Sequence, residues 1–412
     1  MRVVMVKGIS QYGGTRLFVE HAATAFRARG WDVELVDIPH ERDVAPLLRR
    51  AARLATDLVF TINYLGEFRD PTGRSVAEIF RAPHVLWHTD YVLAREARVV
   101  GTPRMTALLT VDPTQVDAVE AILGADRFVC LGFFPHPAVG EPAPDDADVE
   151  AFVRNRPIPL LWSGSFQKPR ERPWAQAPQA ARDIFEAALE LALASEWTPP
   201  HQALDTVLRA TGMDMSDPDL MGARMAAKAT DQEVRLHRRF ALLEALSASG
   251  QPLYICGAGW EDELHRFPDA VYAGAVEMSR MTELMRRSRV VLNTNGNFGA
   301  GSHERPFSAL LAGAAVFSDY SRYYACAFAE DEISLFRWMA LDTGMEALRA
   351  LVEQPQRAFA QARKGKAKVL AHHTWAHRLD LILEAAAALQ REGFAAPRQA
   401  VKVYPAELSP PG

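Results

Sequence analysis

The most informative stretch of the chain covers residues 290–319 and reads VVLNTNGNFGAGSHERPFSALLAGAAVFSD. An apolar strand ends at Asn293, a loop with three glycines follows, and a short apolar helix begins near Arg305. The helix stops near Gly313, just before another apolar run that predicts a strand. Strands that alternate with helices predict a parallel sheet, and ligands bind at the carboxyl ends of its strands.

The loop and the start of this helix have the chemistry of a diphosphate site. Glycines let the backbone approach a ligand closely, and the first turn of a helix offers free N–H groups. Ser302 or His303 can cap the helix, while His303 and Arg305 add positive charge. The alternative is a glycine-rich turn in which Glu304 and Arg305 form surface ion pairs.

The alternation of strands and helices extends over most of the chain. We therefore expect two α/β domains with parallel sheets, at about residues 1–140 and 150–390, and a loose tail over 393–412. Strands of the first domain are predicted at 2–6, 32–36, 58–62, 84–87, 107–110 and 128–131. Strands of the second are predicted at 158–162, 253–256, 290–293 and 315–318, before a last helix at about 374–392.

Two segments interrupt this alternation. Residues 134–146 are rich in proline and acidic residues, which predicts a linker that packs little. Between Lys168 and Asp231, predicted helices at 180–195 and 202–211 indicate a helical insertion in the second domain, at about residues 168–231. Such an insertion either shapes a binding site at the edge of the sheet or stabilises the fold away from it.

The composition excludes several classes of protein. The 412 residues are 49% hydrophobic and 24% charged, which is typical of folded globular chains and not of disordered or collagen-like ones. A net charge of -5 argues against a nucleic-acid polymer as partner. Cys130, Cys256 and Cys326 are widely spaced, so we expect buried thiols in a reducing compartment. With no signal-peptide pattern and no apolar run of ~18 residues, we expect a cytoplasmic protein without a transmembrane segment.

Two further motifs are less specific. Residues 7–15 read KGISQYGGT, in which Gly8, Ser10 and Gly13 approach the dinucleotide fingerprint, and Asp37 lies where a ribose-binding acid would. This loop could instead bind an acceptor or only turn the chain. His372, His373 and His377 lie close together in sequence and could bind a metal ion. No HExxH pattern or nearby carboxylate completes such a site, so we expect no metal here.

The chain resembles glycosyltransferases of the GT-B fold, and most closely the CgeB-like branch with a "glycosyl transferases group 1" C-terminal domain. The resemblance covers most of the chain except the insertion, and its motifs are more specific in the second domain. The segments that carry it are CGAGW (256–260), SRVVLN (288–293), SHERPF (302–307), LAGAAVFSD (311–319), HTWAHR (373–378), WHTD (87–90) and VD (111–112).

The resemblance implies two facing Rossmann-like domains, with the final helices packed back toward the first. The second domain would bind a nucleotide-sugar donor and the first an acceptor, at a loop that includes Gly13 and Gly14. Many retaining relatives carry two glutamates eight positions apart, where this chain has Ala300 and Ser308, so the stereochemistry stays open. The implied donor-binding residues are Ser163, Gly164, Ser165, Lys168, Gly257, Gly259, Trp260, Asn295, Ser302, His303 and Arg305.

An inverting transfer also needs a base that takes the proton of the acceptor. The candidates are Glu67, His88 and Asp90, which follow strands of the first domain, and Glu304, which lies near the place of the missing glutamates. Each of them could instead be an ordinary polar group of a loop.

We therefore expect a metal-independent glycosyltransferase that moves a sugar from a nucleotide-diphosphate sugar to a protein, glycan or small molecule. The nucleotide-sugar would be a co-substrate, and no cofactor is expected. One alternative is a nucleotide-sugar epimerase of related fold, which would use the same phosphate site without an acceptor. Others are a non-catalytic sugar-binding or surface-assembly protein, and an NAD-dependent enzyme that uses the loop from Gly8 to Gly13.

Overall fold

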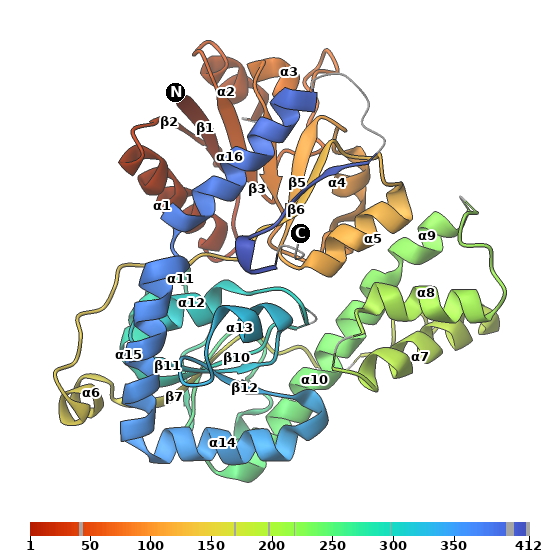
Figure 1. Ribbon diagram of the computed structural model, residues 1–412. Coiled ribbons are helices and arrows are strands. Elements are labelled where there is room, and N and C mark those ends of the chain that lie inside the picture. Colours follow the sequence, from red (N-terminus) through yellow and green to blue (C-terminus); the bar gives the residue numbers. More distant parts are fainter. Residues whose placement is uncertain are drawn as a thin grey trace. The chain divides into compact units, whose positions relative to one another are not determined.

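Figure 1 shows the computed structural model of the chain, which describes residues 1–40, 44–168, 170–196, 198–217, 219–296, 298–392 and 399–408. The chain forms two compact units, each built around one parallel sheet. Unit 1 comprises Met1–Pro137 and Thr374–Gly412, and unit 2 comprises Ala138–His373. The predicted α/β class with two parallel sheets is confirmed.

Unit 1 contains a sheet of seven strands in the order β13-β6-β5-β4-β3-β1-β2. The central strands β3 to β6 are buried along their whole length, as expected of parallel strands that are covered on both faces. The strands are β1 (Arg2–Lys7), β2 (Asp32–Asp37), β3 (Leu58–Ile62), β4 (His84–Trp87), β5 (Thr106–Thr110), β6 (Cys130–Phe133) and β13 (Val401–Val403). The helices are α1 (Gly14–Ala28), α2 (Val44–Ala51), α3 (Val76–Phe80), α4 (Glu96–Gly101), α5 (Pro113–Leu123) and α16 (Trp375–Glu392).

The last helix and part of the tail belong to unit 1, not to the expected second domain at 150–390. In Figure 1, α16 (blue) crosses the orange strands, and the ring of Trp375 lies 5.9 Å from that of Trp87 and 6.2 Å from that of Phe134. The expected loose tail contains β13, which pairs in parallel with β6 and approaches Gly132 so closely that a Cβ there would collide with Val403. Residues 393–398 and 409–412 of that tail lie outside the described residues.

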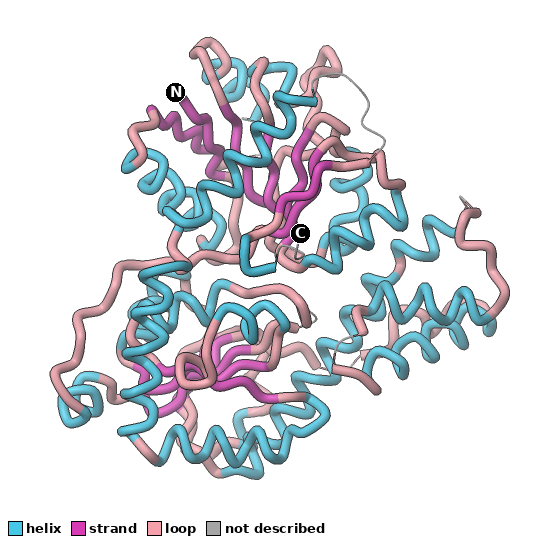
Figure 2. Tube along the Cα trace, in the orientation of Figure 1, coloured by secondary structure: helices cyan, strands magenta, loops and turns pink. Residues whose placement is uncertain are grey.

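Unit 2 contains a sheet of six strands in the order β12-β11-β10-β7-β8-β9. Its core includes Trp162, Trp260 and Phe317, and helices surround the sheet in Figure 2. The strands are β7 (Ile158–Ser163), β8 (Tyr254–Cys256), β9 (Val271–Tyr272), β10 (Ser288–Asn293), β11 (Ala315–Asp319) and β12 (Ser334–Phe336). The helices are α6 (Val149–Asn155), α10 (Ala227–Ser249), α11 (Met278–Arg286), α12 (Glu304–Leu311), α13 (Arg322–Ala327), α14 (Leu341–Glu353) and α15 (Pro355–His372).

The predicted insertion is helical. It contains α7 (Gln179–Leu193), α8 (Pro200–Ala210) and α9 (Leu220–Met225), which pack on the first part of α10 and extend away from the sheet (green in Figure 1). These helices bury a small core of their own around Trp174, Leu189 and Val234. The insertion is therefore anchored to unit 2 through α10, whose second half packs in the main core.

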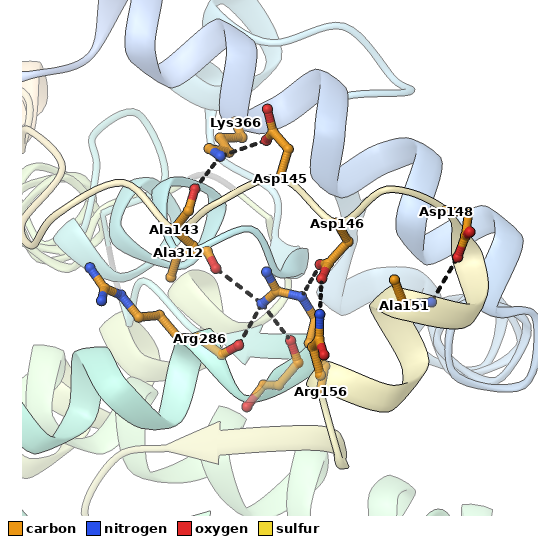
Figure 3. A network of polar contacts seen from close by, with 11 residues as sticks. Ala143, Asp145, Asp146, Asp148, Ala151, Arg156, Arg286, Ala312 and Lys366 are labelled. Carbon is orange, nitrogen blue, oxygen red and sulfur yellow. Dashed lines mark hydrogen bonds and ion pairs between the residues drawn. The ribbon is translucent and has the colours of Figure 1, made fainter.

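The prediction that residues 134–146 pack little is wrong. Lys366 of α15 binds the carbonyl of Ala143 and, at 2.6 Å, Oδ1 of Asp145 (Figure 3). Arg156 donates to Oδ2 of Asp146 at 3.0 Å and to the carbonyl of Ala312 at 3.0 Å. Lys366 of α15 and Arg156 at the end of α6 thus hold two carboxylates and one backbone carbonyl of this segment.

Two smaller observations complete the fold. Cys130 and Cys256 are buried free thiols as expected, whereas Cys326 is exposed, because it lies on the outer side of the short helix α13. Among the helices that the structure describes, none combines the length and the apolar character needed to cross a bilayer.

Candidate functional site

Polar side chains gather in unit 2 where β7, β10 and β11 end. Asn293, the last residue of β10, pairs with Ser318 of β11 and donates from Nδ2 to its hydroxyl at 2.9 Å. Arg305, in the first turn of α12, donates from Nη1 to Oδ1 of Asn293 at 2.7 Å. A glycine loop and a helix N-terminus therefore meet the ends of the strands, as the sequence predicts.

The hydrogen bonds fix the direction of two amide groups. A guanidinium only donates, so the oxygen of Asn293 faces Arg305 and its nitrogen faces Oδ1 of Asn295, at 3.1 Å. The hydroxyl of Tyr324 also donates to that oxygen, at 2.9 Å, and Asp319 accepts from the backbone N–H of Asn295 at 2.8 Å. The acceptor atom of the Asn295 side chain is thus saturated, and its Nδ2 is directed elsewhere.

Two buried polar atoms at these strand ends lack a hydrogen-bond partner among the residues that the structure describes. They are Nδ2 of Asn295 and Oγ of Ser163, the last residue of β7, and both side chains are 3% exposed. Nearly all buried polar atoms in folded proteins are hydrogen-bonded, because an unpaired one costs about 1–3 kcal/mol. Both atoms could hydrogen-bond to a ligand that supplies polar groups at this edge of the sheet.

The start of α12 is held by His303 and Tyr324. His303 is the N-cap, since its Nδ1 accepts from the backbone N–H of Arg305 at 3.3 Å, and Ser302 is fully buried beside it. The same Nδ1 lies 2.5 Å from Oε2 of Glu304, a contact that needs a proton on Nδ1, whereas the cap needs its lone pair, so the two contacts exclude each other; burial lowers the pKa of the imidazole. The alternative of a Glu304–Arg305 surface ion pair does not describe the structure, because these side chains turn to His303 and Asn293 respectively.

Two arginines that the sequence analysis did not single out complete the site. Arg239 of α10 donates from Nη1 to the carbonyl of Ser165 at 2.7 Å, and Arg235 lies over the α-carbon of Gly296, whose φ is 68°. Burial, and then repulsion from Arg235 and Arg305, lowers the pKa of Arg239 to about 10. The sequence predicts a helix that contains both arginines. It does not predict that this helix approaches the loop after β7, because that depends on how the chain folds back onto the sheet after the insertion.

Asp319 lies beneath these cations, at the end of β11. Burial raises its pKa to about 7, although it accepts from Asn295 and from Nε1 of Trp338, the latter at 3.3 Å. The side chain therefore titrates close to neutral pH while it holds the start of the glycine loop.

The glycines after β8 have a structural explanation. A Cβ at Gly257 would collide with the carbonyl of Gly164, and one at Gly259 with the carbonyl of Phe166, so the turn after β8 packs directly against the turn after β7. Trp260 is 1% exposed and donates from Nε1 to the carbonyl of Gly164 at 2.8 Å. Its side chain supports the turn from within the core, so its buried ring offers no surface on which a nucleotide-sugar could stack.

Lys168 stands apart from the arginines. It is exposed and forms an ion pair with Asp262, so this structure gives its charge a partner within the chain. Ser163, Gly164 and Ser165 do lie at the site, where they form the turn that Arg239 and Trp260 contact.

The candidate bases of unit 1 gather after β3 and β4. His88 is 1% exposed, neither ring nitrogen has a partner within the described part of the chain, and burial lowers its pKa to about 4. Asp90 contacts Arg95 at 3.4 Å, and Glu67 contacts Arg98 at 3.2 Å. Of the three, His88 is the one whose proton-accepting group is not engaged by a cation.

The loop that precedes these residues is strained. Asn63 and Leu65 have φ values of 54° and 68°, a conformation that costs a residue with a side chain roughly 1–3 kcal/mol. The loop is held by Arg98, which donates to the carbonyl of Asn63 at 2.6 Å, and by Thr89, whose N–H donates to Oδ1 of Asn63 at 2.8 Å. Strain of this kind clusters at functional sites.

The first glycine loop turns the chain into α1. Gly13 is the N-cap of α1 with a φ of 70°, and Gly14 is the first residue of the helix. Arg16 contacts both carboxylate oxygens of Asp37, at 2.7 and 3.0 Å, and donates to the carbonyl of Gly8 at 3.2 Å. The acid that a dinucleotide ribose would need is therefore already bound, which disfavours the NAD interpretation.

Of the three C-terminal histidines, His373 is buried, whereas His372 and His377 are exposed. The ring of His373 lies 5.3 Å from that of Phe307 and 5.0 Å from that of Phe328, and Nδ1 of His377 lies 2.8 Å from Oγ1 of Thr374. In the described ranges, no three or more His, Cys, Asp or Glu side chains are placed to hold a metal ion.

Part of the chain matches a known family by sequence. Residues 238–384 match a family model described as "Glycosyl transferase-like", a region that contains Arg239, the glycine loop and α12. No curated protein matches the chain by sequence.

Solved structures of glycosyltransferases share the fold. Sucrose-phosphate synthase from Thermosynechococcus elongatus has a TM-score of 0.55 at 12% identity, over 96% of this chain and 100% of that one. Anabaena Alr3699/HepE, solved in complex with UDP-glucose, has a TM-score of 0.52 at 12% identity, over 94% and 100% of the two chains. An alpha-glucosyltransferase in complex with UDP and a 13-mer DNA gives 0.51 at 13% identity, over 94% and 99%. The chain therefore has the GT-B fold, whereas membership of the CgeB-like branch stays a prediction.

Proposed function

We propose that this protein is a glycosyltransferase that moves a sugar from a nucleotide-diphosphate sugar to an acceptor. The observation that carries the proposal is the pair of unpartnered buried atoms, Asn295 Nδ2 and Ser163 Oγ, next to Arg239 and Arg305. Hydrogen-bond donors beside guanidinium groups and a helix N-terminus suit the oxygens of a diphosphate. The match to the family model and the shared fold support this choice of ligand.

The residues of unit 2 would stabilise the leaving group. When the anomeric carbon transfers, its bond to the diphosphate oxygen breaks, a bond to the acceptor oxygen forms, and negative charge develops on the diphosphate. Arg239 and Arg305 are already fixed by hydrogen bonds, so they can stabilise this charge without reorganisation. The proposed mechanism uses these groups in place of a metal ion.

His88 is the base that we propose for an inverting transfer. Its imidazole is neutral at physiological pH and can accept a proton, but the burial that lowers its pKa to about 4 also makes it a weak base, so the proposal requires that this pKa rises towards neutrality when an acceptor binds. Because His88 is buried in this structure, such a contact requires the residues that cover its imidazole to move. Glu304 is a weaker candidate, because its carboxylate is bound to His303.

The test of the donor site is a thermal-shift panel of nucleoside diphosphates and nucleotide-sugars. A ligand at a hundred times its dissociation constant should stabilise the folded protein by ~2.7 kcal/mol. Arg305→Gln should remove this shift, whereas Arg349→Gln, an exposed arginine of α14, should retain it. The proposal fails if no member of the panel shifts the wild-type protein.

Turnover then separates transfer from the alternatives. A glycosyltransferase releases nucleoside diphosphate together with a glycosylated acceptor or, slowly, with free sugar. A changed nucleotide-sugar formed from the donor alone would indicate an epimerase. Donor binding without any product over a broad acceptor panel would indicate a non-catalytic protein.

A further inference from the structure

A cationic cavity lies between α10 and the turn after β7. Its volume is about 290 Å³, and it shares Arg239 with the proposed donor site. Three guanidinium groups and two amide groups line it, together with one leucine, and no carboxylate does. The lining residues are Gln167, Arg170, Gln232, Arg235, Leu236 and Arg239.

Neighbouring cations of the same segment are neutralised, but Arg170 is not. Lys168 forms an ion pair with Asp262, and Arg172 forms one with Glu186. Arg170 lies between them in sequence and donates only to an uncharged group, the Oε1 of Gln232, at 3.3 Å. In the part of the chain that the structure describes, it has no carboxylate within ion-pair distance.

The other two arginines of the cavity are weakly compensated. Arg235 lies 3.7 Å from Asp231, and Arg239 donates to an uncharged group, the carbonyl of Ser165. Glu233 faces the adjoining cavity, where it lies near Arg170 and Arg172 without forming a close pair. Like charges that gather without counter-charges destabilise a folded chain, and a bound anion relieves that repulsion.

The positive charge at this edge exceeds what one diphosphate needs. Arg305 and Arg239 belong to the proposed donor site, and Arg235 lies over the glycine loop of that site and 3.7 Å from Asp231, which leaves Arg170 as the guanidinium group of the cavity that is available to a further negative group. We propose that this cavity binds a second anionic group, a carboxylate or a phosphate, carried by the donor sugar or by the acceptor. The inference rests on the proposed function, and it predicts that the enzyme prefers an acidic or phosphorylated substrate.

The experiment compares matched pairs of ligands by isothermal titration. The first pair is a nucleoside diphosphate-glucose and the corresponding glucuronic acid conjugate, with the nucleoside diphosphate alone as reference. The second pair is glucose and glucose 6-phosphate, each titrated in the presence of the nucleoside diphosphate. Each is measured with the wild-type protein, with Arg170→Gln, with Arg305→Gln, and with Arg172→Gln as the paired control two residues away.

The expected result is a preference of about tenfold for the anionic member of one pair, which Arg170→Gln abolishes and Arg172→Gln retains. Preference within the first pair places the anion on the donor, and preference within the second places it on the acceptor. Arg170→Gln should leave the affinity for the nucleoside diphosphate unchanged within about twofold, whereas Arg305→Gln should reduce it strongly.

Two results would overturn the inference and leave the proposed function standing. In one, the wild-type protein binds the nucleoside diphosphate but does not distinguish the members of either pair. In the other, Arg170→Gln weakens nucleoside diphosphate binding as much as Arg305→Gln, so that the cavity is only part of the diphosphate site. Conversely, a preference for glucose 6-phosphate with no affinity for any nucleoside diphosphate would support the cavity and refute the proposed donor site.

Discussion

Nη1 of Arg305 donates to Oδ1 of Asn293 over 2.7 Å, and this one bond sets the direction of the amides at the end of β10. Because the guanidinium cannot accept, the Asn293 nitrogen must donate to Asn295, whose own nitrogen is left for a ligand. The arrangement therefore couples the guanidinium of Arg305 to a hydrogen-bond donor on Asn295, and a substitution of Asn293 can break this coupling without removing the charge of Arg305.

We expect Asn293→Asp to weaken nucleoside diphosphate binding about tenfold or more. The new carboxylate would pair with Arg305 and neutralise it, and its second oxygen would face the oxygen of Asn295 where a donor is required. Isothermal titration measures the effect, with Asn293→Ala as the variant that removes the amide but adds no charge. Equal affinities of Asn293→Asp and the wild-type protein would show that Arg305 does not contact the ligand.

The hydroxyl of Tyr324 links the two ends of the glycine loop, at Asn295 and His303. It donates to Oδ1 of Asn295 at 2.9 Å and accepts from the backbone N–H of His303 at 2.8 Å. Tyr324→Phe keeps the ring but leaves a buried N–H without its partner, which should cost about 1–3 kcal/mol of unfolding free energy. The same variant should raise KM for the donor more than it lowers kcat, since it loosens the loop and spares the reacting groups. Tyr254→Phe on β8 is the control, and an unchanged KM in Tyr324→Phe would contradict this role.

Stability should depend on the protonation of Asp319. Burial raises its pKa from 3.8 to about 7, so between these pH values the folded state holds a proton that the unfolded state has released. The contribution of this group to the free energy of unfolding therefore falls as pH rises from about 4 to 7. Urea titrations at several pH values should show that the stability of the wild-type protein relative to Asp319→Asn decreases across this window. A difference that is constant with pH would refute the shifted pKa.

His88 should produce the opposite dependence. Its pKa is lowered from 6.5 to about 4 by burial, so in this window the unfolded state binds a proton that the folded state rejects. Stability is thus lost as pH falls from about 6.5 to 4, and His88→Gln should flatten that slope. His84→Gln is a matched control, because His84 is equally buried with a pKa of about 3 but is bound to Thr61. Both variants should change the slope, and only His88→Gln should reduce kcat.

The sequence predicts the local parts of this site well and its long-range parts poorly. The strand that ends at Asn293, the glycine loop and the cap at His303 follow from hydrophobic pattern and helix-capping preferences, which act over a few residues. Arg239 contacts the turn after β7 and Arg235 contacts the glycine loop because α10 packs back on the sheet after the insertion. The residues next to these arginines in sequence do not indicate this packing. The same limit explains why Tyr324 was not anticipated.

The assignment of the last helix to the second domain, at 150–390, differs from the structure for a related reason. Residues 375–392 have the pattern of a helix, but the pattern does not say which sheet the helix covers, and the ring contacts of Trp375 with unit 1 decide it. The three-residue strand β13 is too short to carry a periodic signal. The proline-rich segment at 134–146 contains the junction between the two units, at Pro137 and Ala138, but it packs more than its composition predicts because Lys366 and Arg156, which bind it, lie outside the segment.

That segment gives a final prediction, which concerns Gly313. Its φ is 77°, and a Cβ there would collide with the guanidinium of Arg156, which holds Asp146 and the carbonyl of Ala312. Gly313→Ala should therefore lower the free energy of unfolding by about 2 kcal/mol or more, the sum of backbone strain and displacement of Arg156. Gly250→Ala is the control, because Gly250 ends α10 with a similar φ of 63° but has open space around it, so that only the backbone cost of roughly 1 kcal/mol remains. Chemical denaturation of the two variants separates the cost of backbone strain from the cost of displacing Arg156. Equal losses of unfolding free energy would mean that Arg156 moves aside without cost.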